Sequence, residues 1–184
     1  PFCFRRTLPK RLFSEVTAMT VRNATESDLS EILTIYAKAR EFMKKTGNPT
    51  QWAGGYPKET LLREDIATGT LYVIEKTGEI HGVFAFFPEG DPLYDALPVS
   101  WRNDLPYAAI HRVASAGTEK GVLRTCIDFC LTLSKNLKID THKDNLVMQS
   151  ALQKLGFESC GIAVIPDVGE RIVYQRFEGE KELS

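Results

Sequence analysis

The stretch from His111 to Arg124 constrains the fold of this chain more than any other. It runs from an apolar segment, residues 108–115, through a short polar loop with two glycines into an amphipathic helix. A loop that enters a helix N-terminus leaves several backbone N–H groups without intrahelical partners, and the helix dipole favours negative charge there. The pattern predicts a loop that holds the pyrophosphate of a nucleotide-like cofactor. An ordinary strand–turn–helix connection is the alternative.

The hydrophobic periodicity of the remaining chain indicates alternating strands and helices. Strands are expected at residues 20–24, 71–74, 80–87, 108–115, 137–141, 157–165 and 170–177. Helices are expected at residues 25–47, 57–69, 122–136 and 144–155. The strand–helix–strand unit around residue 122 should pair in parallel, whereas the hairpins pair antiparallel. The order β-α-α-β-β-β-α-β-α-β-β therefore predicts an α/β fold, a mixed sheet with helices on both faces.

Composition excludes several classes of protein. The formal net charge of −1 gives no basic patch for nucleic acid, and no apolar run of about 18 residues is present to span a membrane. Four cysteines, Cys3, Cys126, Cys130 and Cys160, lack zinc-site spacing. They are expected to be free thiols, which fits a reducing cytoplasmic compartment.

The N-terminal segment, residues 1–18, differs from the rest of the chain. It carries four basic residues and one acidic residue, and it lacks the apolar centre of a secretory signal. Met19 reads as a natural start. Residues 1–18 are therefore expected to be an added or upstream extension, with a basic targeting segment as the alternative. Residues 19–184 are expected to form a single domain.

A second pattern lies downstream, where Asn145 opens a helix that closes on Gly156 and Phe157. Together with residues 110–115 and 139–145, it resembles the GNAT acyltransferase superfamily, and within it a bacterial branch. The resemblance covers about residues 19–177 and implies the GNAT fold. It implies transfer of an acetyl or other acyl group from acetyl-CoA to a primary amine of a small molecule or protein, and a homodimer is common in that family. A GNAT-fold protein that holds CoA or another ligand without turnover is the alternative.

The resemblance also implies which residues hold acetyl-CoA. The family pattern Arg/Gln-x-x-Gly-x-Gly/Ala, aligned on Gly121, places Thr118 at its first position and the larger Leu123 at its last. Leu123 takes space where backbone and pyrophosphate approach closely, but the backbone N–H donors do not depend on side chains. The expected cofactor-binding residues are Val113, Ala114, Ser115, Thr118, Glu119, Lys120, Gly121, Val122, Leu123, Arg124, Asn145 and Gln149.

Acyl transfer to an amine also needs a base. His111 is the expected base because histidine titrates near neutral pH, and a hydrogen-bonded core histidine is the alternative. Arg112 is expected on the opposite face of the sheet, since side chains alternate along a strand. Many family members have a Tyr that protonates the leaving thiolate, but Leu152 stands at that position. Tyr107, Cys160, Tyr174 or water could supply the proton instead.

Aromatic residues in and beside the loops are candidates for the acceptor pocket, with anchoring of long loops to the core as the alternative. The expected acceptor-binding residues are Trp52, Tyr56, Tyr94, Trp101, Tyr107 and His142. No metal site is expected, because the cluster of Asp140, His142 and Asp144 offers a single nitrogen ligand.

Overall fold

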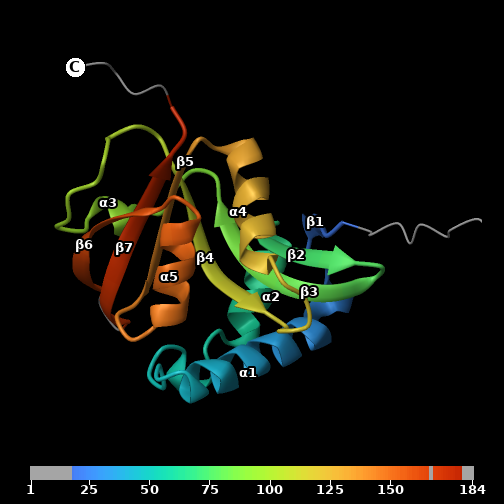
Figure 1. Ribbon diagram of the computed structural model, residues 1–184. Helices are drawn as coiled ribbons and strands as arrows, with labels where there is room; N and C mark the ends of the chain where they lie inside the picture. The colour runs from blue at the N-terminus through green and yellow to red at the C-terminus, as the bar shows by residue number, and fades with distance from the viewer. Residues whose placement is uncertain (1–17, 166–167, 180–184) are drawn as a thin grey trace, which may run out of the picture.

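The computed structural model of the chain describes residues 18–165 and 168–179 (Figure 1). The strands are β1 (Thr20–Asn23), β2 (Leu71–Lys76), β3 (Glu79–Phe87), β4 (Ala108–Ser115), β5 (Asn136–His142), β6 (Glu158–Ile165) and β7 (Gly169–Phe177). The helices are α1 (Leu29–Lys45), α2 (Glu59–Ala67), α3 (Pro92–Asp95), α4 (Val122–Leu133) and α5 (Leu146–Lys154), with short 3₁₀ turns at Glu26–Asp28 and Ala53–Gly55. The expected extension up to residue 17 and the tip of the last hairpin at residues 166–167 lie outside the described residues.

The described strands form one sheet of seven strands in the order β1-β2-β3-β4-β5-β7-β6. β4 and β5 pair in parallel, and the other neighbours pair antiparallel. This arrangement confirms the expected mixed sheet and the expected order of its main elements. The additional short helix α3 begins where Asp91 accepts a hydrogen bond from the Leu93 N–H and Pro92 occupies the first turn, two features that favour a helix start.

Two helix boundaries differ from the sequence-based expectation. α4 was expected to continue to residue 136 but ends at Leu133, because Ser134 adopts an extended conformation and Asn136 opens β5. The Asn136 side-chain amide donates to the carbonyls of Leu105 and Pro106, which ties the start of β5 to the loop before β4. α2 was expected to begin at Pro57 but begins at Glu59, since Lys58 before it is extended.

Helices cover both faces of the sheet. α1 and α2 pack on one face through Ile32, Tyr36 and Leu62, and α4 and α5 pack on the other through Ile127 and Leu152 (Figure 1). The thiols of Cys126, Cys130 and Cys160 are free and buried, as expected. No described helix is both long and apolar enough to cross a membrane.

The two central strands separate partway along their length. Residues 108–110 of β4 pair with residues 137–139 of β5, and no pairing continues beyond Ile110 and Ile139. On its other side β4 pairs with β3, and the register shifts between Val83 and Ala85, so that two residues of β4 oppose one of β3. This β-bulge and the separation of the strands create the opening that holds the candidate site.

Candidate functional site

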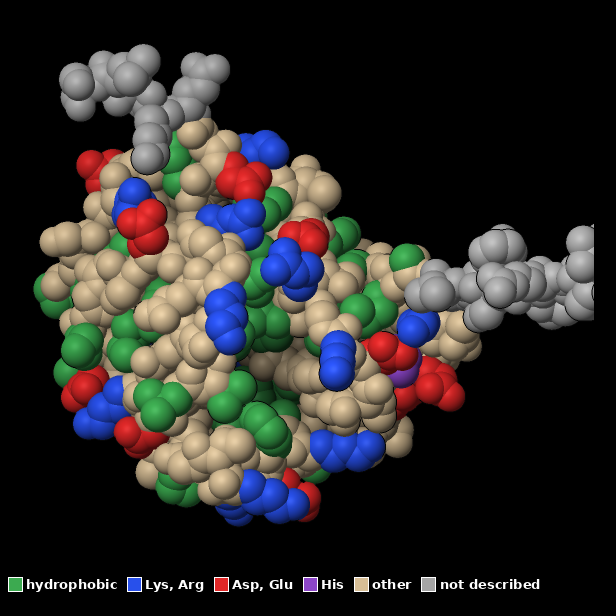
Figure 2. Space-filling view, in the orientation of Figure 1, with side chains coloured by type: hydrophobic (Ala, Val, Ile, Leu, Met, Phe, Trp, Pro, Cys, Tyr) green, Lys and Arg blue, Asp and Glu red, His purple; other side chains and the backbone are tan. Residues whose placement is uncertain are grey.

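A cavity of about 1230 Å³ lies where β4 and β5 separate. Its lining includes Val122 and Met148 from the α4 and α5 side of the sheet and Ala39 and Trp52 from the α1 side. The cavity therefore passes through the sheet. Figure 2 shows the molecule hollowed near its centre, with hydrophobic side chains around the opening.

The β4 bulge changes the direction of the side chains at the cavity. Arg112 has a φ of 54°, and its guanidinium forms an ion pair of 2.8 Å with Asp65 of α2. Both His111 and Arg112 contact the ring of Phe87. The ring centres of His111 and Phe87 are 5.4 Å apart, and the guanidinium carbon of Arg112 lies 5.5 Å from the centre of the Phe87 ring. The expectation that Arg112 faces the opposite side of the sheet from His111 is therefore wrong, because the bulge interrupts the alternation on which it depended.

His111 lies in the cavity lining between two carboxylates. Its Nε2 lies 3.0 Å from Asp91 Oδ2, at ion-pair distance but outside hydrogen-bond geometry, and its Nδ1 lies 3.9 Å from Asp140 Oδ1. The contact with His111 lowers the pKa of Asp91, against an opposing effect of burial. His111 is thus a partly buried imidazole held beside two acids.

Asp140 is itself held by two neighbours. The Tyr94 hydroxyl donates to its Oδ1 at 2.6 Å, and the Arg171 Nε lies 3.2 Å from its Oδ2. Burial, opposed by Asp140, lowers the pKa of Arg171. The role of Asp91 and Arg171 in the site was missed by the sequence analysis, and only a long-range pairing signal could have revealed it, since both lie far from His111 in the chain.

The loop before α4 has the features of an anion-binding turn. Gly121 precedes the helix with a φ of 84°, a conformation that favours glycine. The N–H groups of Val122, Leu123 and Arg124 have no hydrogen-bond acceptor among the described residues. The loop is tied to the sheet, because Thr118 Oγ1 and His81 Nδ1 are 2.7 Å apart and Glu119 pairs with Lys76 at 2.8 Å.

The structure brings half of the expected cofactor residues to the cavity. Those in the lining are Val113, Ala114, Ser115, Val122, Leu123 and Asn145. Those outside the lining are Thr118, Glu119, Lys120, Gly121, Arg124 and Gln149. Asn145 also caps α5 by accepting a hydrogen bond from the Met148 N–H, as expected, and its amide donates to Gln51 at 2.9 Å.

Only some of the expected acceptor residues line the cavity. Trp52 and Tyr56 do, whereas Tyr94, Trp101, Tyr107 and His142 do not. Lys138 lies 3.9 Å from the centre of the Trp101 ring and 3.6 Å from that of Tyr107, so these two rings enclose a buried ammonium group.

None of the side chains considered as proton donors to the leaving thiolate lines the cavity: Tyr107, Cys160 and Tyr174 all lie outside it. Leu152, at the position where the resemblance leads us to expect a Tyr, is buried in the core. No group of three or more His, Cys, Asp or Glu side chains is arranged for a metal ion within residues 18–165 and 168–179.

Comparisons with known proteins agree with this geometry. No family model matches the sequence, and no curated protein matches it. An acetyltransferase of the GNAT family from Streptococcus agalactiae is 28% identical, with a TM-score of 0.79 over 88% of this chain and 96% of that chain. A GNAT-family acetyltransferase from Listeria monocytogenes is 19% identical, with a TM-score of 0.65 over 87% and 95% of the two chains. The protein yncA from Salmonella typhimurium, solved with acetyl-CoA, is 16% identical, with a TM-score of 0.57 over 90% and 96%.

The separated central strands and the glycine loop at α4 define an acyltransferase fold. The chain belongs to the GNAT superfamily and is an acyltransferase enzyme.

Proposed function

We propose that this enzyme transfers an acetyl group from acetyl-CoA to a primary amine of a small molecule or a protein, with His111 as the base. The observation that carries the proposal is the position of His111. It lines the cavity where β4 and β5 separate, between the carboxylates of Asp91 and Asp140. A base at this point meets an acceptor that enters from the α1 side.

The residues of β4 and of the α4 side of the sheet fit acetyl-CoA. The N–H groups at the start of α4 suit a pyrophosphate. Ala116 N–H donates to His81 O of β3, and because successive N–H groups of a strand point to opposite edges, Ser115 N–H and Val113 N–H point toward the opening. These donors suit an extended pantetheine arm. Acetyl-CoA, when bound, supplies an electrophilic thioester carbonyl.

His111 has one nitrogen suited to accept the proton. Nε2 is buried beside Asp91, which favours a proton on that atom and leaves Nδ1 as the base. Nδ1 takes a proton from the ammonium group of the acceptor, which leaves a neutral amine. With acetyl-CoA bound, the amine nitrogen would bond to the acetyl carbon as the C–S bond breaks, and the proton that the nitrogen loses would go to the leaving thiolate. Asp91 and Asp140 then stabilise the imidazolium charge.

Two measurements test this function. Calorimetric titration should show binding of acetyl-CoA, and release of free thiol should depend on the presence of an amine. N-acetylated product should appear in the mass spectrum in the same amount as the thiol. Binding without amine-dependent thiol release would instead indicate a CoA-binding protein without turnover, and absence of binding would contradict both readings.

A further inference from the structure

The charged side chains in the cavity lining limit what kind of amine the proposed acetyltransferase can accept. They are Lys38, Asp91, His111, Arg112, Asp140 and Arg171. Two of the cations already have a permanent anionic partner. Arg112 pairs with Asp65 at 2.8 Å, with side chains only 10% and 6% exposed, and Arg171 pairs with Asp140 at 3.2 Å, with side chains 7% and 16% exposed.

Asp91 is the carboxylate in the described lining that lacks a permanent cation. Its Oδ2 contacts His111, which is charged only when protonated, and its Oδ1 accepts the Leu93 N–H. Lys38 lies on the exposed surface of α1. When His111 is neutral and ready to act as a base, the site therefore carries one unbalanced negative charge, which matches a single ammonium group.

The walls around this charge are apolar. Large apolar side chains that stay partly exposed converge on the cavity from four segments: Phe42 of α1, Tyr56 of the following loop, Leu93 of α3 and Val168 of the last hairpin. Exposed apolar side chains that line one cavity indicate a binding surface.

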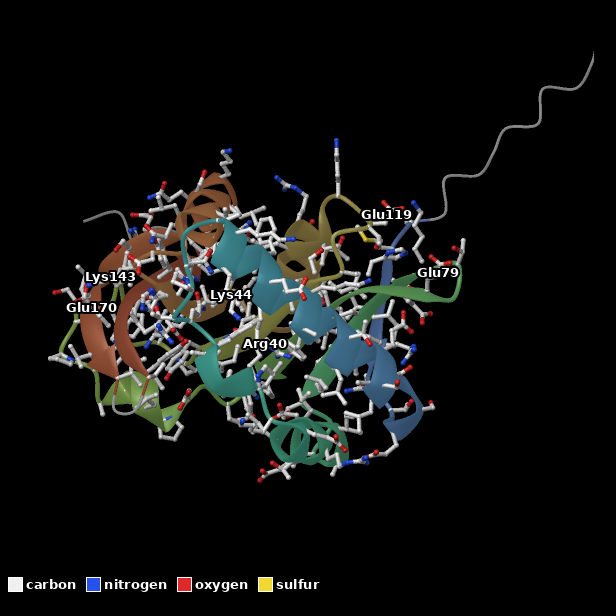
Figure 3. The ribbon with its side chains drawn as sticks, turned by 90° about the horizontal axis from the view of Figure 1, so that it is seen from below. Arg40, Lys44, Glu79, Glu119, Lys143 and Glu170 are labelled. Carbon is white, nitrogen blue, oxygen red and sulfur yellow. The ribbon has the colours of Figure 1, made fainter. Side chains whose placement is uncertain are left out.

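The wall that carries Tyr56 is fixed to α1. Arg40 donates to the Tyr56 carbonyl at 3.0 Å, which ties the loop to this helix (Figure 3). Trp52 of the same loop packs edge-on against Tyr36 of α1, with ring centres 5.6 Å apart. The part of the apolar surface that carries Tyr56 is therefore held in place by α1.

We propose that the acceptor is a primary monoamine with an apolar substituent and no second charged group. This inference rests on the proposed function. A second ammonium group in the acceptor would lie among Arg112 and Arg171. A carboxylate would have to compete with Asp140 for Arg171, in a place where burial makes a broken ion pair costly.

Matched ligands test the proposal by binding, independently of turnover. Calorimetry with coenzyme A present compares phenethylamine with phenylalanine, which adds a carboxylate, and butylamine with putrescine, which adds an ammonium group. We expect each monoamine to bind at least about tenfold more tightly than its partner. Equal or weaker binding of the monoamines, or no binding of phenethylamine, would overturn the proposal.

A variant of Asp91 tests whether this carboxylate recognises the ammonium group of the acceptor. Asp91→Asn keeps an α3 cap but removes the negative charge, so it should abolish the preference for phenethylamine over the neutral phenethyl alcohol. Asp95→Asn is the matched control, because Asp95 lies on α3 outside the cavity lining; it should keep the preference. An unchanged preference in Asp91→Asn would contradict the assignment.

Turnover separates the two proposals. If the enzyme acetylates phenylalanine or putrescine more efficiently than the monoamines, the proposed function stands and the monoamine inference fails. If the monoamines bind selectively but no thiol is released from acetyl-CoA, the proposed function fails and the binding inference stands.

Discussion

His111 and Arg112 are consecutive residues of β4, yet both side chains lie on the same face of the sheet, beside Phe87. The centre of the Phe87 ring lies 5.4 Å from the centre of the His111 ring and 5.5 Å from the guanidinium carbon of Arg112. The bulge at Arg112 causes this arrangement, and the Tyr36 hydroxyl stabilises it by donating to the Arg112 carbonyl at 2.8 Å. One irregular residue thus places the imidazole of His111 at the cavity and a buried cation beside it.

The Arg112 cation makes Asp65 important for stability. Asp65→Ala leaves the guanidinium buried without its partner, and we expect the free energy of unfolding to fall by about 3–5 kcal/mol in urea titrations. Burial raises the pKa of Asp65, and Arg112 opposes this effect. Removing the two charged groups from water therefore offsets part of the stabilisation that their ion pair provides. The double variant Asp65→Leu, Arg112→Met should therefore recover most of the loss. Glu64→Ala, an exposed neighbour, is the control, and an equal loss there would contradict this reading.

Gly82 permits the close approach of α4 to β3. A Cβ atom at this position would lie 2.3 Å from Val122 Cγ1, so Gly82→Ala should displace the start of α4 and its N–H donors. We expect weaker binding of acetyl-CoA in calorimetry together with a lower melting temperature. Adding Val122→Ala removes the obstructing methyl group and should restore binding in part. A lower melting temperature with normal affinity in Gly82→Ala would contradict binding of the cofactor at the α4 N-terminus.

The Thr118 hydroxyl lies 2.7 Å from His81 Nδ1, so Thr118 ties the loop before α4 to β3. Thr118→Val removes this hydrogen bond while keeping the shape of the side chain. We expect acetyl-CoA affinity to fall by about threefold to tenfold, the effect of one hydrogen bond of about 1 kcal/mol. Thr132→Val, near the other end of α4, should leave the affinity unchanged. An equal change in both variants would mean that the loop is not held by His81.

Asp28 makes the stability of the first helix depend on acid pH. Its hydrogen bonds with Arg22, and more weakly with Thr25, lower the pKa of this carboxyl from 3.8 to about 2. Because the folded state has the lower pKa, the stabilisation is complete above the ordinary pKa and is lost as the pH falls toward about 2. The free energy of unfolding of the wild type should therefore decline across this range. Asp28→Asn should flatten the decline, and an unchanged slope would contradict the assignment.

The sequence predicted the elements whose causes are local. β4 occurs at the predicted residues, and the cap at Asn145 follows from a residue type that suits this position. The direction of Arg112 could not be predicted, because a bulge depends on pairing between strands that are distant in sequence. The partnership of His111 with Asp91 and of Asp140 with Arg171 arises only after the sheet has assembled. Tyr94 and Trp101 were expected in the acceptor pocket because loop aromatics resemble pocket walls, yet both pack against the core.

The most direct test of the central claim is the effect of His111→Ala on acetyl transfer to amines of decreasing basicity. Removal of a base should lower kcat/KM by about 100-fold or more for strongly basic amines, which carry a proton that must be removed. The loss should shrink for weakly basic amines that are already neutral, and His142→Ala, outside the cavity lining, should resemble the wild type. If His111→Ala retained the wild-type kcat/KM with every amine, His111 would not be the base and the proposed mechanism would be wrong.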